Sequence, residues 1–490
     1  MALLPSQADS GDGEAAALAP AWVPAPAEDE VASAGSSSGR IRNVEAVPGK
    51  RPDNFVRLRE SWLGRLYIGH LKPYAAVRWA VQWLWRHGYP IYVNQIATRG
   101  KRGQARRWRR LTPLRAFATK MAIRTDQLVP ASRVETPEPS VFPADDRAFL
   151  ASPHAQYEFP EIIVATLDDA TTYGGTNLVL VGRDDVVCHD LYDFARDYTS
   201  EELHGRTLIS PRRRRIRWLL NDEEPEAVPL AATFVDACAG NYAHWLTEVL
   251  PRIALFCTDE RFKDVPLVVN SGLHANIMES LLLVAGTDRE IITLGVGRAL
   301  TVKQLHVTAA AGYVPFGRRS NRLSGHSHGV FSPPAFERLR HGLTTHLGKA
   351  AGGSWPEKIF IRRASGPRML ANSAEIERLM VASGYAIIQP ETLSFMQQVR
   401  LFANARIVVS PTGAALANAI FCQPGTQVGV FMAKHEEMIY RYWFDMLTPL
   451  QIGVSYVLGN LVEVSKLGIH GNFTAARADV ADLLEALEQR

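Results

Sequence analysis

Residues 406–418 have the sequence RIVVSPTGAALAN, and this stretch decides the fold. Its first five residues have the length of a buried strand with the apolar centre Ile-Val-Val, and small residues follow from Pro411 onward without a spacer. A buried strand that enters a turn of small residues at the start of a helix is typical of parallel α/β sheets. We therefore predict an α/β protein.

The alternation of strands and helices continues on both sides of this stretch. Short apolar runs of strand length occur at 178–181, 266–269, 291–294, 358–362 and 385–388. A segment rich in Gly, Ser, His and Pro at 324–334 interrupts the pattern and is interpreted as a linker. The sequence therefore predicts two α/β domains, at 151–330 and 331–490.

Two helix starts are predicted in the second of these domains. Asn372 precedes Glu375 by three residues, and Ser394 precedes Gln397 by the same spacing. This spacing is that of a capping box, in which the side chain of each residue accepts a hydrogen bond from the backbone N–H of the other. We expect both pairs to begin helices in this way.

The first 150 residues differ in composition from the rest. Residues 1–50 are rich in Ala, Pro, Ser and Gly and predict a disordered tail. Residues 51–150 predict an accessory segment, in which an aromatic stretch at 61–92 precedes an arginine-rich stretch at 99–110 that contains no acid. Three interpretations of this pair stay open: a solvated basic face, a peripheral membrane contact through 60–110, and a single-strand nucleic-acid site. Nothing else in the chain supports the third, so no nucleic-acid partner is expected.

The composition of the 490-residue chain limits the class of protein. Hydrophobic residues make up 47% of it, which supplies sizeable cores, and the net charge of +4 is small for this length. The four cysteines are far apart in the sequence and are predicted to be free thiols. The lack of a signal peptide and of an apolar run of spanning length predicts a cytoplasmic location. If the aromatic and arginine-rich stretches bind lipid, the protein would be peripheral at the inner membrane. High Ala and Arg content indicates a bacterial source.

A phosphate site is predicted around the turn after the strand at 406–410. Small residues there let a ligand approach backbone N–H groups at a helix start, and guanidinium groups at the ends of neighbouring parallel strands can bind a diphosphate. The candidate residues are Arg362, Arg363, Arg368, Ser394, Gln397, Pro411, Thr412, Gly413, Ala414 and Asn418.

A second cluster lies in the first domain, at 236–252. His244 and Glu248 are four residues apart on one helix face, and a carboxylate beside an imidazole is a proton-accepting pair. Asp236, a few residues before them, is a further candidate for this chemistry. Three residues of the same segment are candidates for contact with a second substrate: Asn241, Tyr242 and Trp245.

No metal site is predicted. His326 and His328 would point in different directions on a helix, and no Cys or carboxylate completes a ligand set. The acidic pairs at 168–169 and 184–185 lack the Asp-x-Asp spacing, and a turn or an exposed loop explains them. No cofactor is expected beyond a substrate that carries a nucleotide.

Three motifs in order resemble glycosyltransferase family 61, met in bacteria as capsular polysaccharide biosynthesis proteins of the DUF563 type. They are GNYAHWLTEVLPR at 240–252, KIFIRR at 358–363 and LFANARIVVSPTGAALANAIF at 401–421, within a resemblance that spans about 160–460. The resemblance implies a GT-B fold, in which two Rossmann-type domains face a cleft. It also implies inversion at the anomeric carbon without an obligatory metal, and UDP-linked sugars such as N-acetylglucosamine, xylose or arabinose as donors.

The resemblance also assigns sides to the two clusters. It places the regions of Arg362 and Gly413 at the donor, and His244 with Glu248 near the acceptor. Many eukaryotic members have His-Gly-Ala where this chain has Thr412-Gly413-Ala414. A hydroxyl cannot replace an imidazole as a base, so we assign Thr412 to donor contact.

The resulting hypothesis is a hexosyl- or pentosyltransferase that moves a sugar from a nucleotide diphosphate to a hydroxyl of a glycan or polysaccharide precursor. A nucleotide-sugar epimerase could use the same two-domain cleft, and would consume donor without an acceptor. A non-catalytic polysaccharide-assembly or membrane-associated binding protein is the other alternative, and would bind no nucleotide.

Overall fold

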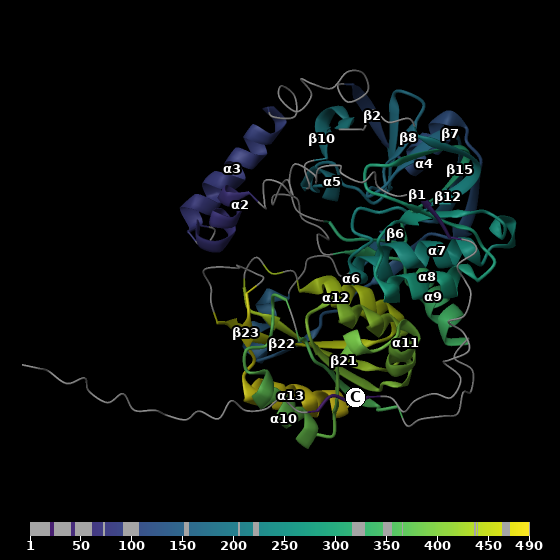
Figure 1. Cartoon of the computed structure of the whole chain (residues 1–490). Helices are drawn as coiled ribbons and strands as arrows, with labels where there is room; N and C mark the ends of the chain where they lie inside the picture. The colour runs from purple at the N-terminus through teal and green to yellow at the C-terminus, as the bar shows by residue number, and fades with distance from the viewer. Residues whose placement is uncertain are drawn as a thin grey trace, which may run out of the picture.

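The structure is a computed structural model that describes most of the chain beyond residue 107 and shorter pieces before it. The described ranges are 20–23, 41–44, 61–71, 74–91, 107–150, 156–203, 206–218, 225–315, 329–345, 355–364, 366–435, 438, 440–462 and 471–489. Figure 1 shows two α/β units, one above the other, with the helices α2 and α3 to one side of them.

The second unit is built on a sheet whose strands are parallel except at one edge. The order is β19 (Ala386–Ile388), β18 (Lys358–Ile361), β20 (Ile407–Pro411), β21 (Gln427–Ala433), β22 (Gly453–Leu461) and antiparallel β23 (Phe473–Thr474). A strand from the first half of the chain, β5 (Ser140–Phe142), also pairs with β22 in parallel.

Helices cover both faces of this second sheet. Phe360 and its side of the sheet pack against α10 (Ser373–Ala382) and α13 (Arg477–Glu488). The alternate residues, such as Ile359, pack against α11 (Phe395–Asn404) and the 3-10 helix η9 (Ala414–Phe421). Apolar residues on both faces explain why these strands are continuous apolar runs in the sequence. The remaining helices near this unit are α9 (Pro333–Thr345) and α12 (Arg441–Leu447).

The first unit has a 12-stranded mixed sheet. Its parallel part has the order β1 (Ile41–Val44), β14 (Ile291–Leu294), β13 (Leu267–Asn270), β12 (Glu226–Thr233) and β15 (Ala299–Thr308). The sheet continues as β7 (Ile162–Tyr173), β8 (Val179–Val181), β9 (Asp185–Cys188), β2 (Trp108–Pro113), β11 (Arg215–Trp218) and β10 (Thr207–Ser210), and β3 (Thr125–Val129) pairs with β7. Apart from parallel β9 and β2, these neighbours are antiparallel.

Helices and two small sheets complete the first unit. The helices are α4 (Leu114–Met121), α5 (Ser200–Leu203), α6 (Tyr242–His244), α7 (Leu250–Cys257) and α8 (Ala275–Ala285), and the small sheets pair β4 (Ser132–Glu135) with β6 (Gln156–Phe159) and β16 (Gly312–Tyr313) with β17 (Val330–Phe331). The α/β class is therefore confirmed. A pair of Rossmann-type domains is not confirmed, because half of the first sheet is antiparallel.

The predicted strands agree with the structure to within one residue at either end. The run at 291–294 is β14 with the same bounds, and the run at 358–362 is β18 without its last residue. The predicted linker at 324–334 lies partly outside the described residues. Its described end forms β17 and the start of α9, which packs against α7 of the first unit.

The prediction of a disordered tail over 1–50 is wrong where the structure describes this region. Strand β1 lies at the edge of the first sheet and pairs with β14. Farther upstream, the backbone N–H of Trp22 donates to the carbonyl of Ile387, 2.7 Å away, and its indole packs on Trp355. Backbone pairing needs no distinctive side chains, so the composition does not reveal these contacts.

The prediction of a separate accessory segment over 51–150 is wrong for its second half. Strands β2 and β3 belong to the first large sheet, and β5 belongs to the second. The arginine-rich stretch is also structural where it is described: Arg110 forms two hydrogen bonds with Asp185, at 2.7 and 2.6 Å, and Arg107 pairs with Asp184 at 2.5 Å. The acidic pair at 184–185 thus has ion-pair partners on the neighbouring strand.

The helices α2 (Trp62–Leu66) and α3 (Ala75–Ile91), with the π-helical turn η1 (Tyr67–Leu71), stand apart from both sheets. Ser61 begins α2, because its hydroxyl accepts from the N–H of Gly64. None of the helices within the described ranges combines the length and hydrophobicity needed to cross a membrane.

Candidate functional site

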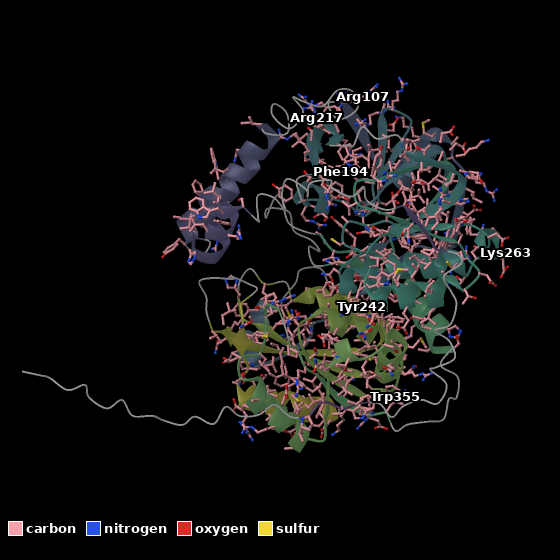
Figure 2. The ribbon with its side chains drawn as sticks, in the orientation of Figure 1. Arg107, Phe194, Arg217, Tyr242, Lys263 and Trp355 are labelled. Carbon is pink, nitrogen blue, oxygen red and sulfur yellow. The ribbon has the colours of Figure 1, made fainter. Side chains whose placement is uncertain are left out.

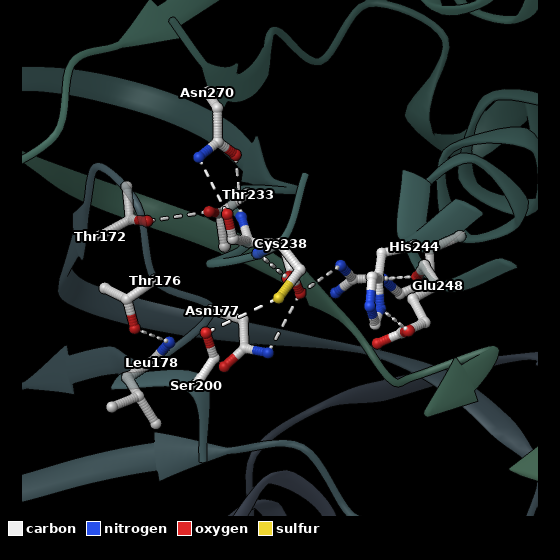
Figure 3. Close-up of polar contacts among 12 residues, drawn as sticks. Thr172, Thr176, Asn177, Leu178, Ser200, Thr233, Cys238, His244, Glu248 and Asn270 are labelled. Carbon is white, nitrogen blue, oxygen red and sulfur yellow. Dashed lines mark hydrogen bonds and ion pairs between the residues drawn. The ribbon is translucent and has the colours of Figure 1, made fainter. Parts of the chain in front are cut away.

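A cavity in the first unit brings together the three predicted catalytic residues. His244, Glu248 and Asp236 all line it. The other lining residues are Leu111, Asn177, Leu178, Cys188, His189, Tyr192, Tyr198, Thr199, Ser200, Glu201, Ala237, Cys238, Arg252, Ala310, Gly312, Tyr313 and Val314. Figure 3 shows His244 and Glu248 side by side, with Cys238, Asn177 and Ser200 facing them.

The helix that carries His244 and Glu248 is irregular, whereas the sequence pattern predicts a regular one. Between α6 and α7 the chain forms a π-helical turn, η6 (Trp245–Val249), in which the N–H of Leu250 donates to the carbonyl of Trp245. Pro251 follows and has no N–H to donate, so a regular ladder of hydrogen bonds cannot continue through it. Wide turns of this kind are frequent at functional sites.

His244 and Glu248 form a hydrogen bond between Nδ1 of the imidazole and Oε1 of the carboxylate. An ionised carboxylate only accepts, so Nδ1 carries the proton and Nε2 is the nitrogen that would take one from a substrate. Burial lowers the pKa of His244, but the charge and the hydrogen bond of Glu248 outweigh it and raise the pKa above its ordinary 6.5. Burial raises the pKa of Glu248, and His244 opposes this shift.

Asp236 is held by the protein on several sides. Its Oδ1 accepts from the N–H of Cys238 at 2.9 Å and its Oδ2 accepts from Asn177 at 3.1 Å, while Arg252 lies 3.6 Å from Oδ2. Arg252 also donates from Nε to the carbonyl of Glu248, at 2.8 Å. Asp236 therefore connects β12 to the turn that carries the histidine, which is the arrangement of a positioning residue.

Two residues that the sequence analysis missed lie on the same cavity. Burial lowers the pKa of His189 to about 4, so its imidazole is neutral at neutral pH. The imidazole packs on the Tyr313 ring, with 4.4 Å between ring centres. Within the described part of the chain, neither His189 Nδ1 nor the Tyr313 hydroxyl has a hydrogen-bond partner. His189 directly follows the apolar strand β9, and a polar residue at a strand end is the signal that could have identified it.

The turn η6 leaves no room for a side chain at Gly312. A methyl group at Gly312 would lie 2.3 Å from the backbone oxygen of Thr247, inside η6. We expect Gly312→Ala to cost about 1–3 kcal/mol of unfolding free energy, as overpacking of a core does, and to lower turnover by shifting Glu248. Urea unfolding and an activity assay measure the two effects. Gly240→Ala is the matched control, because its methyl group would meet nothing within 4 Å; equal losses in the two variants would contradict the prediction.

The three predicted acceptor contacts, Asn241, Tyr242 and Trp245, all make bonds within the protein. Asn241 caps α6, with its side chain accepting from the N–H of Ala243. Trp245 is completely buried, and its indole N–H donates to Ser280 at 2.8 Å, so its assignment to the acceptor is wrong. Tyr242 lies where the two units meet, as Figure 2 shows, and its hydroxyl donates to Asn418 at 2.8 Å.

Most of the predicted helix-start contacts to a donor are also occupied. Ser394 and Gln397 form the predicted capping box of α11, and the carboxylate of Glu279, on α8, accepts from the N–H groups of Phe395 at 2.8 Å and Met396 at 3.1 Å. A carboxylate thus already binds at the helix start where a phosphate would, and the assignment of Ser394 and Gln397 to the donor stays a prediction.

The side chains of Asn418 and Asn372 both bond within the protein. Asn418 is completely buried, and its side chain bonds to Tyr242, to Gln398 and to the carbonyl of Ala415, so it fixes the turn. Asn372 precedes α10 but its side chain bonds to Glu375 and Ala475, so no capping box forms there.

The two adjacent arginines after β18 have opposite surroundings. Arg362 is paired with the buried carboxylate of Glu377, at 2.9 and 2.6 Å, and is thereby held against α10. Arg363 lies on the other side and donates to the carbonyls of Pro367 at 2.8 Å and Thr412 at 3.2 Å. Successive residues of an extended chain point in opposite directions, which explains the difference.

Arg363 and Arg368 form a cationic pair beside Gly413. Burial and then the charge of Arg368 lower the pKa of Arg363, and burial lowers the pKa of Arg368. In the described residues Arg368 Nε has no hydrogen-bond partner, and Arg368 has a positive φ of 66°, which is uncommon outside glycine. A methyl group at Gly413 would lie 2.3 Å from Arg363 Nη1, so the glycine makes room for the guanidinium.

The remaining residues of the turn are mostly buried. Pro411 ends β20, and the hydroxyl of Thr412 accepts from the indole N–H of Trp443 at 2.9 Å. Ala414 begins η9, which is a 3-10 helix where the sequence predicts a helix start. Arg363, which donates to the carbonyl of Thr412, is therefore a charged side chain beside this turn.

Potential metal ligands and thiols need only brief mention. No group of three or more His, Cys, Asp and Glu side chains in the described ranges could hold a metal ion, and His326 and His328 lie outside those ranges. All four cysteines are free thiols, as predicted.

Comparison with known proteins identifies one family. No curated protein matches the chain significantly. Residues 242–429 match the model of the family Glycosyltransferase 61. The matched segment begins at α6, ends within β21, and contains His244, Glu248, Arg363 and Gly413. Residues 242–429 of the chain are therefore similar to glycosyltransferase family 61, which supports glycosyltransferase activity.

Proposed function

We propose that this glycosyltransferase moves a sugar from a nucleotide diphosphate to a hydroxyl of a glycan or polysaccharide precursor, with inversion at the anomeric carbon. The two α/β units would act as the two halves of a GT-B-like enzyme, the first facing the acceptor and the second the donor. The mixed first sheet would be an elaboration of the Rossmann-type half.

One observation carries this proposal: the turn with His244 lies against the turn with Gly413. Helix α6, which ends at His244, packs on η9, which begins one residue after Gly413. The bond between Tyr242 and Asn418 fixes this contact. In the proposal, the proton-accepting pair and the cationic pair would face the two substrates from the two sides of this contact, as a transfer between them requires.

The donor end of the proposal rests on Arg363 and Arg368. Cleavage of the bond between the anomeric carbon and the diphosphate oxygen leaves negative charge on the departing nucleotide. Two half-buried guanidinium groups can bind the diphosphate and stabilise that charge. In this proposal they take the part that a divalent cation plays in other transferases, so we expect transfer to proceed without an added metal.

The acceptor end of the proposal rests on His244 and Glu248. His244 would take the proton from the acceptor hydroxyl while that oxygen attacks the anomeric carbon from the side opposite the diphosphate. Glu248 would stabilise the imidazolium that forms, and Asp236 would help to hold the turn in place. His189 and Tyr313 would bind acceptor hydroxyls. The imidazole of His189 is neutral, and both residues line the cavity with polar atoms that have no hydrogen-bond partner in the described part of the chain.

The direct test is calorimetric titration of the protein with UDP, GDP, CMP and dTDP, followed by product analysis with the corresponding sugar donors. We expect one diphosphate nucleotide to bind without added metal, and its sugar to be transferred only when an acceptor glycan is present. Conversion of the donor without acceptor would show an epimerase, and no binding of any nucleotide would favour a non-catalytic assembly protein.

The pH dependence of His244 provides an independent prediction. The imidazole accepts a proton only when neutral, so kcat/KM should rise with pH with a midpoint above 6.5, because Glu248 raises the pKa. In Glu248→Gln that charge is gone, and the pKa of His244 should fall below 6.5 because burial then dominates. Carbon NMR of labelled histidines gives both titrations directly, and unchanged midpoints would show that Glu248 does not act on His244.

A further inference from the structure

The helical arm, defined as residues 61–71 and 74–91, exposes an unusual number of large apolar side chains. Trp62 is 71% exposed, Trp79 67% and Trp83 48%. Other large apolar residues of the arm are also exposed: Leu63, Leu71, Tyr74, Leu84 and Ile91. The proposed transfer reaction uses none of them.

The exposed side of α3 is largely apolar. Residues 76, 79, 83, 84, 87 and 91 are exposed and, at 100° per residue, occupy one side of the helix. Four of them are Trp79, Trp83, Leu84 and Ile91, whereas the less exposed Val77, Arg78 and Val81 lie on the other side. A surface helix of a water-soluble domain presents mainly polar and charged residues to water, so this exposed apolar face is suited to contact with another apolar medium.

The charge of the arm indicates which medium. Between residues 62 and 91 the sequence has four cationic residues, Arg65, Lys72, Arg78 and Arg86, and no Asp or Glu. Trp and Tyr are enriched at the level of lipid headgroups, and cationic residues beside them are attracted to anionic lipids. Neither α2 nor α3 is long and apolar enough to cross a membrane, so contact would be along the surface of the bilayer.

We propose that the helical arm binds the surface of an anionic lipid bilayer, with the exposed face of α3 and Trp62 entering the headgroup region. The arginines of the neighbouring stretch do not contribute where they are described, because Arg107 and Arg110 are paired with acids in the first sheet. The proposal therefore narrows the membrane contact to the arm. It does not depend on the proposed function, because a transferase and a non-catalytic assembly protein could both be held at a membrane in this way.

Vesicle flotation tests the proposal with the full-length protein. Vesicles of phosphatidylcholine with phosphatidylglycerol should carry the protein to the top of the gradient, while vesicles of phosphatidylcholine alone and high salt should carry less. The variant Trp62→Ala, Trp79→Ala, Trp83→Ala should bind roughly tenfold or more weakly, because these side chains supply most of the apolar area that enters the interface. Its thermal unfolding should match the parent, since all three side chains are exposed.

A matched control removes exposed apolar side chains elsewhere. Met121→Ala, Val381→Ala, Val462→Ala changes three residues that are 55%, 50% and 54% exposed, and vesicle binding should stay at the parent level. The proposal fails if the parent does not float with anionic vesicles, or if the tryptophan variant floats equally well. Light scattering tests the alternative that the arm joins two copies of the chain. The proposal is overturned if the parent does not float and is a dimer, and the tryptophan variant is a monomer.

Discussion

Replacement of Glu248 by Gln will lower the rate of sugar transfer by roughly 10²-fold, and replacement of His244 by Ala will lower it by up to about 10⁴-fold. The first variant keeps the shape of the side chain but loses the charge that stabilises a protonated imidazole. The second removes the base itself. Both effects should appear in kcat, measured by product formation at saturating donor and acceptor, while the affinity for the nucleotide stays unchanged.

The control for these variants is Glu260→Gln, an exposed carboxylate of the short helix that follows α7. It removes the same charge without touching the cavity and should transfer sugar at the parent rate. Full activity in His244→Ala would show that another group accepts the proton. Loss of nucleotide binding in either variant would show instead that the turn η6 supports the donor site.

The two neighbouring arginines of the second unit should give opposite results on substitution. Arg363→Ala should weaken nucleotide binding by about 2–5 kcal/mol, because a charged partner of the diphosphate is lost, with little change in stability. Arg362→Ala should instead lower the free energy of unfolding by about 3 kcal/mol, because it removes the cationic partner of the buried carboxylate of Glu377. Calorimetric titration and urea unfolding of the same two proteins separate these outcomes.

Two further variants sharpen this comparison. Gly413→Ala keeps Arg363 but displaces its guanidinium, so it should weaken nucleotide binding by a smaller factor than Arg363→Ala. Arg378→Ala removes an exposed arginine of α10 and should change neither property. Normal binding by Arg363→Ala together with weak binding by Arg362→Ala would reverse the assignment of the two side chains.

The sequence was sufficient for features that depend on neighbours in the chain. The strands of the second sheet are apolar on both faces, so β18 and β20 could be predicted within one residue. The proximity of His244 and Glu248 follows from their spacing, even though the turn between them is wider than an α-helix. The capping box of Ser394 and Gln397 is likewise a local feature.

The rest of the site depends on partners that are distant in the chain. Glu279 lies more than a hundred residues before the helix start that it caps, and no local pattern reveals that this start is occupied. His189 reaches the cavity from a strand that precedes the predicted motif by more than fifty residues. The choice between Arg362 and Arg363 depends on which side of β18 faces α10, and this depends on the packing of the whole unit.

The capping of α11 by Glu279 has a consequence for the way the molecule unfolds. The carboxylate belongs to the first unit and the helix to the second, so separation of the two units would break two charge-assisted hydrogen bonds and replace them by bonds to water. The bond between Tyr242 and Asn418 adds a second such contact. The two units therefore stabilise each other although their sheets are separate, and we expect them to unfold in a single cooperative transition.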